Sequence, residues 1–167
     1  ILAKLSKLGR CNMKVIFVCL GNICRSPMAE AMFKDLVSSA ELSSQIQVDS
    51  AATSTYELGS PPDRRTVKEL AKHGLSATNM IARQLNATDF LEADYILVMD
   101  ENNLRDAKRM APDKNSATKV KLVYSLTPGK EDHVVADPWY TGDFAKTYAD
   151  LSEALPFWLE YLKKRIN

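Results

Sequence analysis

Short apolar runs and amphipathic segments alternate from the start of the chain. Residues 14–19 (KVIFVC) are β-branched and aromatic, which predicts a buried strand. Ser26 and Pro27 then supply a helix cap and a first-turn proline, and apolar side chains at helical spacing predict a helix over 28–37. A second strand is predicted at 46–51. This pattern is typical of a strand–helix–strand unit.

The middle of the chain continues the alternation. Residues 60–62 (SPP) predict a helix start and Gly74 its end. On this helix the side chains expected to face inward are Val67, Leu70 and Ala71. Residues 95–99 (YILVM) are continuously apolar, which predicts a strand covered on both faces. A helix over 101–110 and a shorter fourth strand at 120–123 follow.

The last part of the chain is mainly helical. Residues 137–140 (DPWY) predict a loop, and apolar residues from Phe144 to Leu162 recur at helical spacing. Pro156 lies inside this segment and predicts a kink or break. Strands that alternate with helices favour right-handed βαβ units around a parallel sheet. We therefore expect one compact α/β domain over residues 13–167.

Composition limits the possible function classes. The 167 residues include 22 Lys and Arg against 21 Asp and Glu, a formal net charge of +1. This balance gives no general basic surface, so we expect neither nucleic acid nor a membrane as a partner. No apolar run approaches the roughly 20 residues of a membrane helix. Three Cys and two His without a CxxC or HxxxH pair argue against structural zinc. We expect no metal and no organic cofactor.

The cysteine count and the first residues bear on location. An odd number of cysteines without a signal peptide favours a reducing compartment, so we expect a cytoplasmic protein. Residues 1–12 lack a hydrophobic signal core. Because Met13 directly precedes the first strand-like run, we expect it to be the native start and residues 1–12 to be an extension or a vector-derived segment. Cys11 is then expected to have no role.

The segment that follows the first strand carries the candidate chemistry. Ligands bind beyond the carboxyl ends of strands in an open α/β sheet, and here that end is residues 19–26 (CLGNICRS). Gly21 permits a tight curl, which points successive backbone N–H groups inward at a helix N-terminus and creates an anion cradle. Arg25 can grip two phosphoryl oxygens bidentately. The expected phosphate-binding residues beside Arg25 are Leu20, Gly21, Asn22, Ile23, Cys24 and Ser26.

Cys19 stands at the centre of this expected loop. Helix N-termini and nearby cations favour the thiolate form of cysteine, so we expect Cys19 to be a thiolate at neutral pH. A thiolate that faces a bound phosphate monoester is positioned for in-line attack on phosphorus. A buried cysteine is more often an inert small hydrophobe, and the bare C-x5-R spacing is a weak signal. Its placement between a buried strand and a Ser-Pro helix start favours a functional role.

The same run resembles a known signature. Residues 18–27 (VCLGNICRSP) closely resemble the signature loop of low-molecular-weight protein tyrosine phosphatases. The resemblance covers about residues 13–163 and implies a flavodoxin-like, three-layer α/β fold. Its doubly wound sheet has four parallel strands in the order 2-1-3-4, with helices on both faces. Further similar stretches are 49–54 (DSAATS), 73–75 (HGL), 94–100 (DYILVMD) and 137–139 (DPW).

The resemblance also implies roles for individual residues. It makes Cys19 the nucleophile that forms a phosphocysteine, Arg25 the phosphate clamp, and Asp137 the general acid and then the base. The implied reaction is hydrolysis of phosphotyrosine and small aryl phosphates. An isolated Asp-Pro pair would more often be a simple turn, and an isolated His73 a satisfied core residue. The implied supporting polar network consists of Asn22, Ser26, Ser50 and His73.

The substrate pocket and regulation follow from the same resemblance. The expected pocket walls are Ile23, Tyr56, Trp139 and Tyr140, although lone aromatic side chains more often serve packing. A deep aromatic slot excludes the shorter phosphoserine. In a related phosphoarginine phosphatase branch the position of Ile23 is Thr, so the apolar residue favours an aromatic substrate. Because a neighbouring thiol can capture an oxidised low-pKa cysteine, we expect redox inactivation through a Cys19–Cys24 bond, with Cys24 as a plain loop residue as the alternative. Expected partners are phosphotyrosine proteins, with a tyrosine kinase as a further candidate, and phosphate-like oxyanions are expected inhibitors.

Two other functions compete with this interpretation. Arsenate reductases share the fold and the C-x5-R loop but need further redox cysteines. No cysteine follows Cys24, which excludes an intramolecular relay but leaves a glutathione-coupled variant open. A phosphotyrosine-binding module without turnover would lack the nucleophile, the clamp or the acid, and candidates for all three are present.

Overall fold

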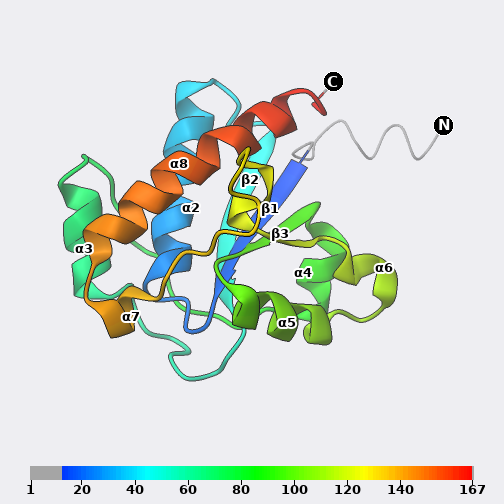
Figure 1. The fold of residues 1–167 in the computed structure, drawn as a ribbon, viewed down its shortest axis with the longest axis horizontal. Coiled ribbons are helices and arrows are strands. Elements are labelled where there is room, and N and C mark those ends of the chain that lie inside the picture. The colour runs from blue at the N-terminus through cyan, green and yellow to red at the C-terminus, as the bar shows by residue number, and fades with distance from the viewer. Residues whose placement is uncertain (1–12, 167) are drawn as a thin grey trace.

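The computed structural model describes residues 13–166, which form a parallel four-stranded sheet between two layers of helices (Figure 1). The strand order is β2-β1-β3-β4, which confirms the predicted topology. The central strand β1 pairs with β2 along its whole length and with β3 over Val15 to Val18. The strands are β1 (Met13–Cys19), β2 (Ile46–Ala52), β3 (Tyr95–Val98) and β4 (Val120–Leu122).

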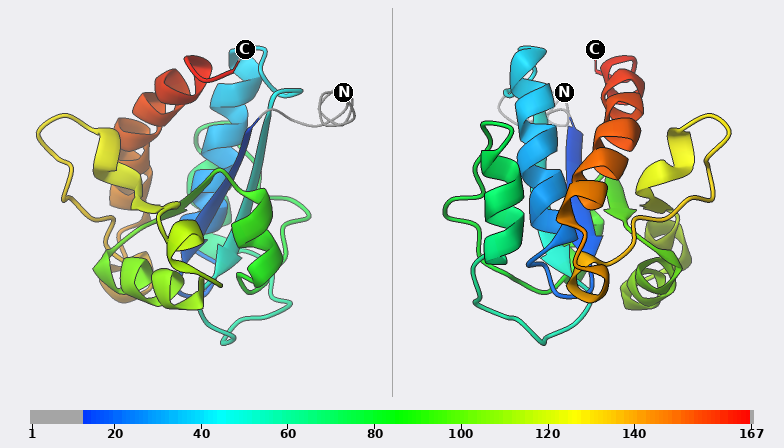
Figure 2. Two further views of the ribbon diagram at one scale, coloured as in Figure 1. Left: turned by 90° about the vertical axis from the view of Figure 1, so that its right-hand side faces the viewer. Right: turned by 60° about the vertical axis from the view of Figure 1, so that its left-hand side comes forward.

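Helices cover both faces of this sheet, as predicted. α2, α3 and α8 pack against one another on one face, and α4 and α5 lie on the other face (Figures 1 and 2). The helices are α2 (Arg25–Ser39), α3 (Arg64–Ala71), α4 (Ala87–Glu92), α5 (Glu101–Met110), α6 (Lys114–Ala117), α7 (Pro138–Thr141) and α8 (Phe144–Lys163), and η1 (Val123–Leu126) is a 3-10 turn.

The side chains of β1 divide the core into two halves. Val15 and Phe17 pack on the α2 and α8 side, where Trp158 is fully buried and donates its indole N–H to the carbonyl of Val123 at 2.8 Å. Ile16 and Val18 point to the opposite face. This is the alternation that a strand covered on both sides requires. The carboxyl end of β1 is therefore held rigidly between two cores.

Two predicted helix starts are wrong. α2 begins at Arg25 after Cys24, so Ser26 lies inside the first turn and its hydroxyl is not the helix cap. α3 is capped by Asp63, whose carboxylate accepts from the backbone N–H of Arg65, rather than by the Ser-Pro-Pro run. On α3 the predicted burial of Leu70 is confirmed, but Val67 and Ala71 are exposed, because the buried face is completed by Thr66 and Glu69.

Pro156 does not break the last helix. α8 continues from Phe144 to Lys163 with Pro156 on its exposed face. Proline deprives the carbonyl four residues earlier of its donor, and here that residue, Ser152, is also exposed and can bond to water. Of the predicted kink or break, the break is therefore wrong, because the helix is continuous through Pro156.

The hydrophobic pattern did not predict three short helices. α4 and α6 lie where no element was predicted, and α7 occupies the predicted loop at 137–140. Each begins with a side-chain cap, from Asn86, Asp113 and Asp137 respectively. Helices of four to six residues are too short to show periodicity, so capping chemistry is their main sequence signal.

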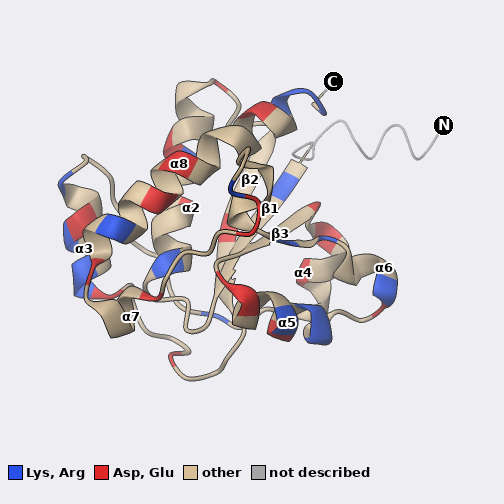
Figure 3. Ribbon diagram, viewed as in Figure 1, with Lys and Arg blue, Asp and Glu red and all other residues tan. Residues whose placement is uncertain are grey.

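Basic and acidic residues both occur along α3, α5 and α8, as the coloured ribbon of Figure 3 shows. Among residues 13–166, no helix combines the length and the apolar character needed to cross a membrane. The predicted boundary at Met13 and the absence of a role for Cys11 concern residues 1–12, which lie outside the described part.

Candidate active site

The loop between β1 and α2 runs from Cys19 to Arg25. Cys19 ends β1 and is 3% exposed. The surrounding segments hold the loop carbonyls from outside: Thr53 N–H donates to Cys19 O at 3.0 Å, and Asp63 N–H donates to Ile23 O at 2.8 Å. Ser54 similarly donates to the carbonyl of Leu20 through its N–H and its hydroxyl. With these carbonyls turned outward, the loop N–H groups are left for the inner side, at the N-terminus of α2.

Asn22 bends this loop and connects it to β2. Its backbone is left-handed, with φ of 57°, a conformation in which asparagine is among the few residues tolerated. Its side-chain amide donates to the hydroxyls of Ser26 at 2.7 Å and Ser50 at 2.9 Å, and the Ser26 hydroxyl lies 3.1 Å from the sulfur of Cys19. The structure thus brings together three of the four predicted network residues beside the predicted nucleophile.

His73 does not join this network. It lies past the end of α3, with Nε2 3.4 Å from a carboxylate oxygen of Glu69 and its ring stacked on Tyr148 at 3.6 Å between centroids. The helix position directs His73 toward α8 rather than toward the loop. Its predicted place in the supporting network is therefore wrong.

Arg25 lies beneath the loop and is 2% exposed. One guanidinium nitrogen donates to Asp100 at 2.6 Å and to the carbonyl of Val135 at 2.9 Å, and the other faces Asp137 at 3.3 Å. Burial lowers the pKa of Arg25, but negative charge on Cys19, Asp100 and Asp137 outweighs burial and raises it overall. Nε of Arg25 is buried without a hydrogen-bond partner among residues 13–166. A buried unpaired donor of this kind indicates room for an acceptor that the folded chain does not supply.

Asp100 was not predicted as a site residue. It follows β3 and caps α5, accepting from the N–H of Asn103 at 2.8 Å with one carboxylate oxygen while the other binds Arg25. An acidic residue immediately after the carboxyl end of a strand is a signal that could have identified it.

Asp137 is far from the β1–α2 loop in the sequence, but it contacts Arg25 in the structure. It caps α7 by accepting from the N–H of Trp139 at 3.1 Å. The loop before it is tied to the sheet, because Val135 N–H donates to Met99 O at 2.8 Å. Both carboxylate oxygens are thus oriented, one by the helix cap and one by Arg25, with the side chain 19% exposed.

A cavity of about 190 Å³ joins these groups to the surface. Cys19 and Arg25 lie at its buried end, whereas Tyr56, Trp139 and Tyr140 line it with side chains that are half or more exposed. All four predicted pocket residues line this cavity. Glu57 also lines it and was not predicted, since nothing in its sequence context marks it. The complete lining is Cys19, Leu20, Gly21, Ile23, Cys24, Arg25, Tyr56, Glu57, Asp137, Trp139 and Tyr140.

The Trp139 ring packs against the guanidinium of Arg65. The guanidinium of Arg65 lies 5.5 Å from the Trp139 ring and 4.6 Å from the Phe144 ring. Asp63 binds the same guanidinium through two bonds of 3.0 Å. Because Asp63 orients the guanidinium, its cation–π contact helps to hold the Trp139 ring in place at the cavity.

Cys24 differs from Cys19 in its surroundings. Burial, followed by the negative charges of Asp63, Cys19 and Asp137, raises the pKa of Cys24 to about 12. Its sulfur therefore stays a thiol at neutral pH. Both cysteines are free in the structure.

Comparison with known proteins decides the family. The family described as low molecular weight phosphotyrosine protein phosphatase matches residues 14–167. The chain belongs to this family. The mouse low molecular weight phosphotyrosine protein phosphatase is 50% identical over 133 residues, which cover 79% of this chain and 83% of the mouse protein.

Solved structures agree with this assignment. The crystal structure of YfkJ from Bacillus subtilis has a TM-score of 0.87 and 37% identity, covering 92% of this chain and 96% of YfkJ. The Drosophila arginine phosphatase structure has a TM-score of 0.83 and 38% identity, covering 90% of this chain and 98% of that one. This phosphatase is therefore similar both to enzymes named for phosphotyrosine and to one named for arginine.

Proposed function

We propose that this phosphatase hydrolyses phosphotyrosine in proteins, and small aryl phosphates, through a phosphocysteine on Cys19. The observation that carries the proposal is the meeting of Cys19, Arg25 with its unpaired Nε, and Asp137 at one cavity. Cys19 and Arg25 come from the loop between β1 and α2, and Asp137 comes from a distant part of the chain. Together they supply a nucleophile, an anion clamp and a proton carrier.

The first chemical step forms the S–P bond. The phosphoryl group binds against the loop N–H groups, with Arg25 Nε and a terminal nitrogen on two of its oxygens. The Cys19 thiolate attacks phosphorus, the P–O bond to the aryl group breaks, and protonated Asp137 gives its proton to the leaving phenolate.

The second step returns the enzyme to its starting state. Asp137, now a carboxylate, takes a proton from a water molecule that attacks phosphorus, and the S–P bond breaks with the electron pair on sulfur. The hydroxyl of Ser26, 3.1 Å from Cys19 Sγ, can donate to the departing thiolate. Inorganic phosphate leaves, and phosphate-like oxyanions are expected to compete for the same cradle.

The depth of the cavity supports an aromatic substrate. The reacting sulfur is almost fully buried, while the Tyr56 and Tyr140 side chains that line the cavity are each 78% exposed. A phenyl ring would carry its phosphate group past this rim toward the buried sulfur, whereas a phosphoserine side chain is shorter. The apolar Ile23 in the lining adds a contact suited to a ring rather than to a guanidinium.

Regulation by oxidation remains a prediction. Oxidation of Cys19 to a sulfenic acid followed by attack of Cys24 would give a disulfide and water, and a thiol reductant would reverse it. The expected cytoplasmic location and the tyrosine-kinase partner also stay predictions.

Trapping the intermediate tests the mechanism. Rapid acid quenching of the wild-type enzyme and of Asp137→Asn during turnover of p-nitrophenyl phosphate should yield a phosphorylated peptide with the phosphate on Cys19. The Asp137→Asn variant should hold more of it, because water activation is slowed. Full turnover by Cys19→Ser, or phosphate on another residue, would contradict the proposal.

A further inference from the structure

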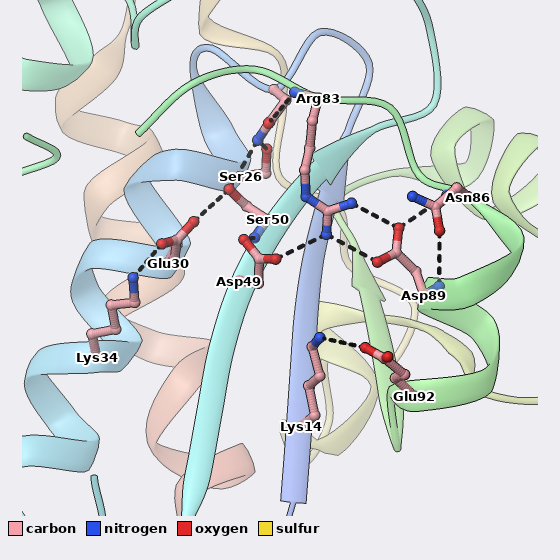
Figure 4. Close-up of polar contacts among 11 residues, drawn as sticks. Lys14, Ser26, Glu30, Lys34, Asp49, Ser50, Arg83, Asn86, Asp89 and Glu92 are labelled. Atoms are coloured by element: carbon pink, nitrogen blue, oxygen red, sulfur yellow. Dashed lines mark hydrogen bonds and ion pairs between the residues drawn. The ribbon is translucent and has the colours of Figure 1, made fainter. Parts of the chain in front are cut away.

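A continuous chain of hydrogen bonds leads from the active-site sulfur to a buried carboxylate on α2. Ser26 contacts Cys19 Sγ, and the amide of Asn22 donates to both Ser26 and Ser50. The hydroxyl of Ser50 donates to Glu30 at 2.6 Å (Figure 4). Glu30 is 5% exposed. Glu30 lies outside the cavity lining and has no contact with substrate in the proposed reaction. Its burial therefore calls for a different explanation.

Both ends of this chain are fixed by groups that have a single hydrogen-bonding role. At one end the backbone N–H of Arg83 can only donate, and it donates to the amide oxygen of Asn22 at 3.2 Å. At the other end the ionised Glu30 carboxylate can only accept, so the Ser50 hydroxyl hydrogen is committed to it. The amide of Asn22 must then turn its NH2 group, and not its oxygen, toward the two serines.

This direction determines where the hydrogen of Ser26 points. Because the Ser26 oxygen accepts from Asn22, its own hydrogen is free for the sulfur of Cys19. With the Asn22 amide reversed, its oxygen would compete for the Ser26 hydrogen and Cys19 would be deprived of a donor. Donation to a thiolate is a charge-assisted bond, stronger than one between neutral groups.

Further ion pairs hold the two ends in place. Glu30 is bound by Lys34 from the next turn of α2 at 2.5 Å. The guanidinium of Arg83 binds Asp89 through two bonds, of 2.8 and 3.0 Å, and Asp49 at 2.9 Å (Figure 4). These contacts fix the backbone whose N–H meets Asn22.

We propose that Glu30 is a positioning residue that, through Ser50 and Asn22, directs the Ser26 hydroxyl hydrogen to the Cys19 sulfur. The proposal rests on the proposed role of Cys19 as nucleophile. Glu30 stabilises the thiolate as attacking group and as leaving group without touching either substrate or sulfur.

A substitution of one atom tests the direction of the chain. In Glu30→Gln the ammonium of Lys34, which can only donate, attracts the new carbonyl oxygen. The amide NH2 then faces Ser50 and forces its hydroxyl to turn toward Asn22, against the observed direction. Ser50→Ala removes the link altogether, and Glu30→Gln/Ser50→Ala closes a double-mutant cycle.

Two measurements are needed, one of which is independent of turnover. The first is kcat/KM for a phosphotyrosine peptide. The second is the pH dependence of the rate of iodoacetamide alkylation of Cys19, located by fragmentation of the tryptic peptide 15–25, which contains both cysteines of the loop. Thermal unfolding of each variant reports folding separately. Glu69→Gln is the matched control, because Glu69 is also a buried helical carboxylate paired with a lysine but has no link to Asn22.

For Glu30→Gln and for Ser50→Ala we expect a decrease of about three- to tenfold in kcat/KM, the scale of a charge-assisted hydrogen bond that is only partly weakened. The alkylation rate should fall by the same factor on the acidic side of its pH profile, where the thiolate fraction limits the rate. The double variant should match Ser50→Ala within about twofold, and Glu69→Gln should stay within about twofold of wild type. Decreases that multiply in the double variant, or unchanged alkylation in Glu30→Gln, would overturn the proposal. Absence of Cys19-dependent turnover in the wild type would instead overturn the proposed function, and the alkylation data would still report on the chain.

Discussion

Replacement of Asp137 by Asn separates chemistry from structure at the proposed proton carrier. Asn keeps a side-chain oxygen that can accept from Trp139 N–H, so the cap of α7 survives. It cannot donate or accept a proton at the leaving group. The substitution removes the ion pair that Asp137 makes with Arg25 at 3.3 Å, whereas the other partners of Arg25, Asp100 and Val135 O, remain.

The structural cost is smaller than the catalytic one. The pair joins a guanidinium that is 2% exposed to a carboxylate side chain that is 19% exposed, so its removal should cost about 1.5–3 kcal/mol, while Asp100 still pairs with Arg25. Asp137→Ala also removes the cap and should cost about 0.5–2 kcal/mol more. For a chain of this size 1 kcal/mol lowers Tm by roughly 2–4 °C. Without general acid catalysis, turnover should instead slow about 10²–10⁴-fold, equally in both variants.

The assay compares two substrates that differ in their leaving group. With phenyl phosphate, which must expel a poor leaving group, both variants should show the full decrease in rate. With p-nitrophenyl phosphate the first step needs less help, so the decrease should be smaller and hydrolysis of phosphocysteine should limit the rate. An equal decrease with both substrates would refute the role of Asp137 as general acid, and a decrease below tenfold with phenyl phosphate would refute both of its roles.

Three further predictions concern Arg25 and the cysteines. Arg25→Lys keeps the charge but should lose most activity and raise KM, because a lysine cannot bind two phosphoryl oxygens through a planar fork. Steady-state kinetics measures this loss, and circular dichroism checks that the fold is unchanged. A kcat/KM near that of the wild type would contradict the prediction. In Cys19→Ser, Cys24 should resist iodoacetamide at pH 7–8, since the pKa of Cys24 is raised to about 12 and the thiolate forms only as pH approaches that value; mass spectrometry would show ready labelling if the burial argument is wrong. Peroxide should inactivate both the wild type and Cys24→Ser, but dithiothreitol should restore more activity to the wild type. The measurement is the activity recovered after dithiothreitol treatment, and equal recovery would exclude the Cys19–Cys24 bond.

The fold was predictable because its central strands carry their own signal. Residues 15–19 and 96–99 are apolar on both faces, and the structure buries them between two helical layers. Ser26 shows the limit of local rules. A serine before a proline normally caps a helix, which would then begin at Pro27. Here the helix begins two residues earlier, at Arg25, and the Ser26 hydroxyl bonds to Cys19 and Asn22 instead.

The site was predictable where chemistry and position coincide, and less so where packing decides. Cys19, Arg25 and Asp137 follow from the loop after β1 and from a family resemblance, and the structure places all three at one cavity. Glu30 contributes through a tertiary contact with Ser50, which no local pattern encodes. Asp100 contributes through a contact with Arg25, and only its place directly after a strand could have indicated it. The prediction for His73 failed because one helix-end histidine can face several neighbours, and here it stacks on Tyr148 of α8.

The most direct test is steady-state hydrolysis of a phosphotyrosine peptide beside matched phosphoserine and phosphoarginine substrates, without added metal, for the wild type and Cys19→Ser. The account predicts turnover of phosphotyrosine alone and its complete loss in Cys19→Ser. Turnover that survives in Cys19→Ser, or a preference for phosphoarginine, would contradict it. The first outcome would exclude a phosphocysteine intermediate on Cys19. The second would show that Ile23 and the aromatic residues at the cavity rim do not select a substrate with an aromatic ring.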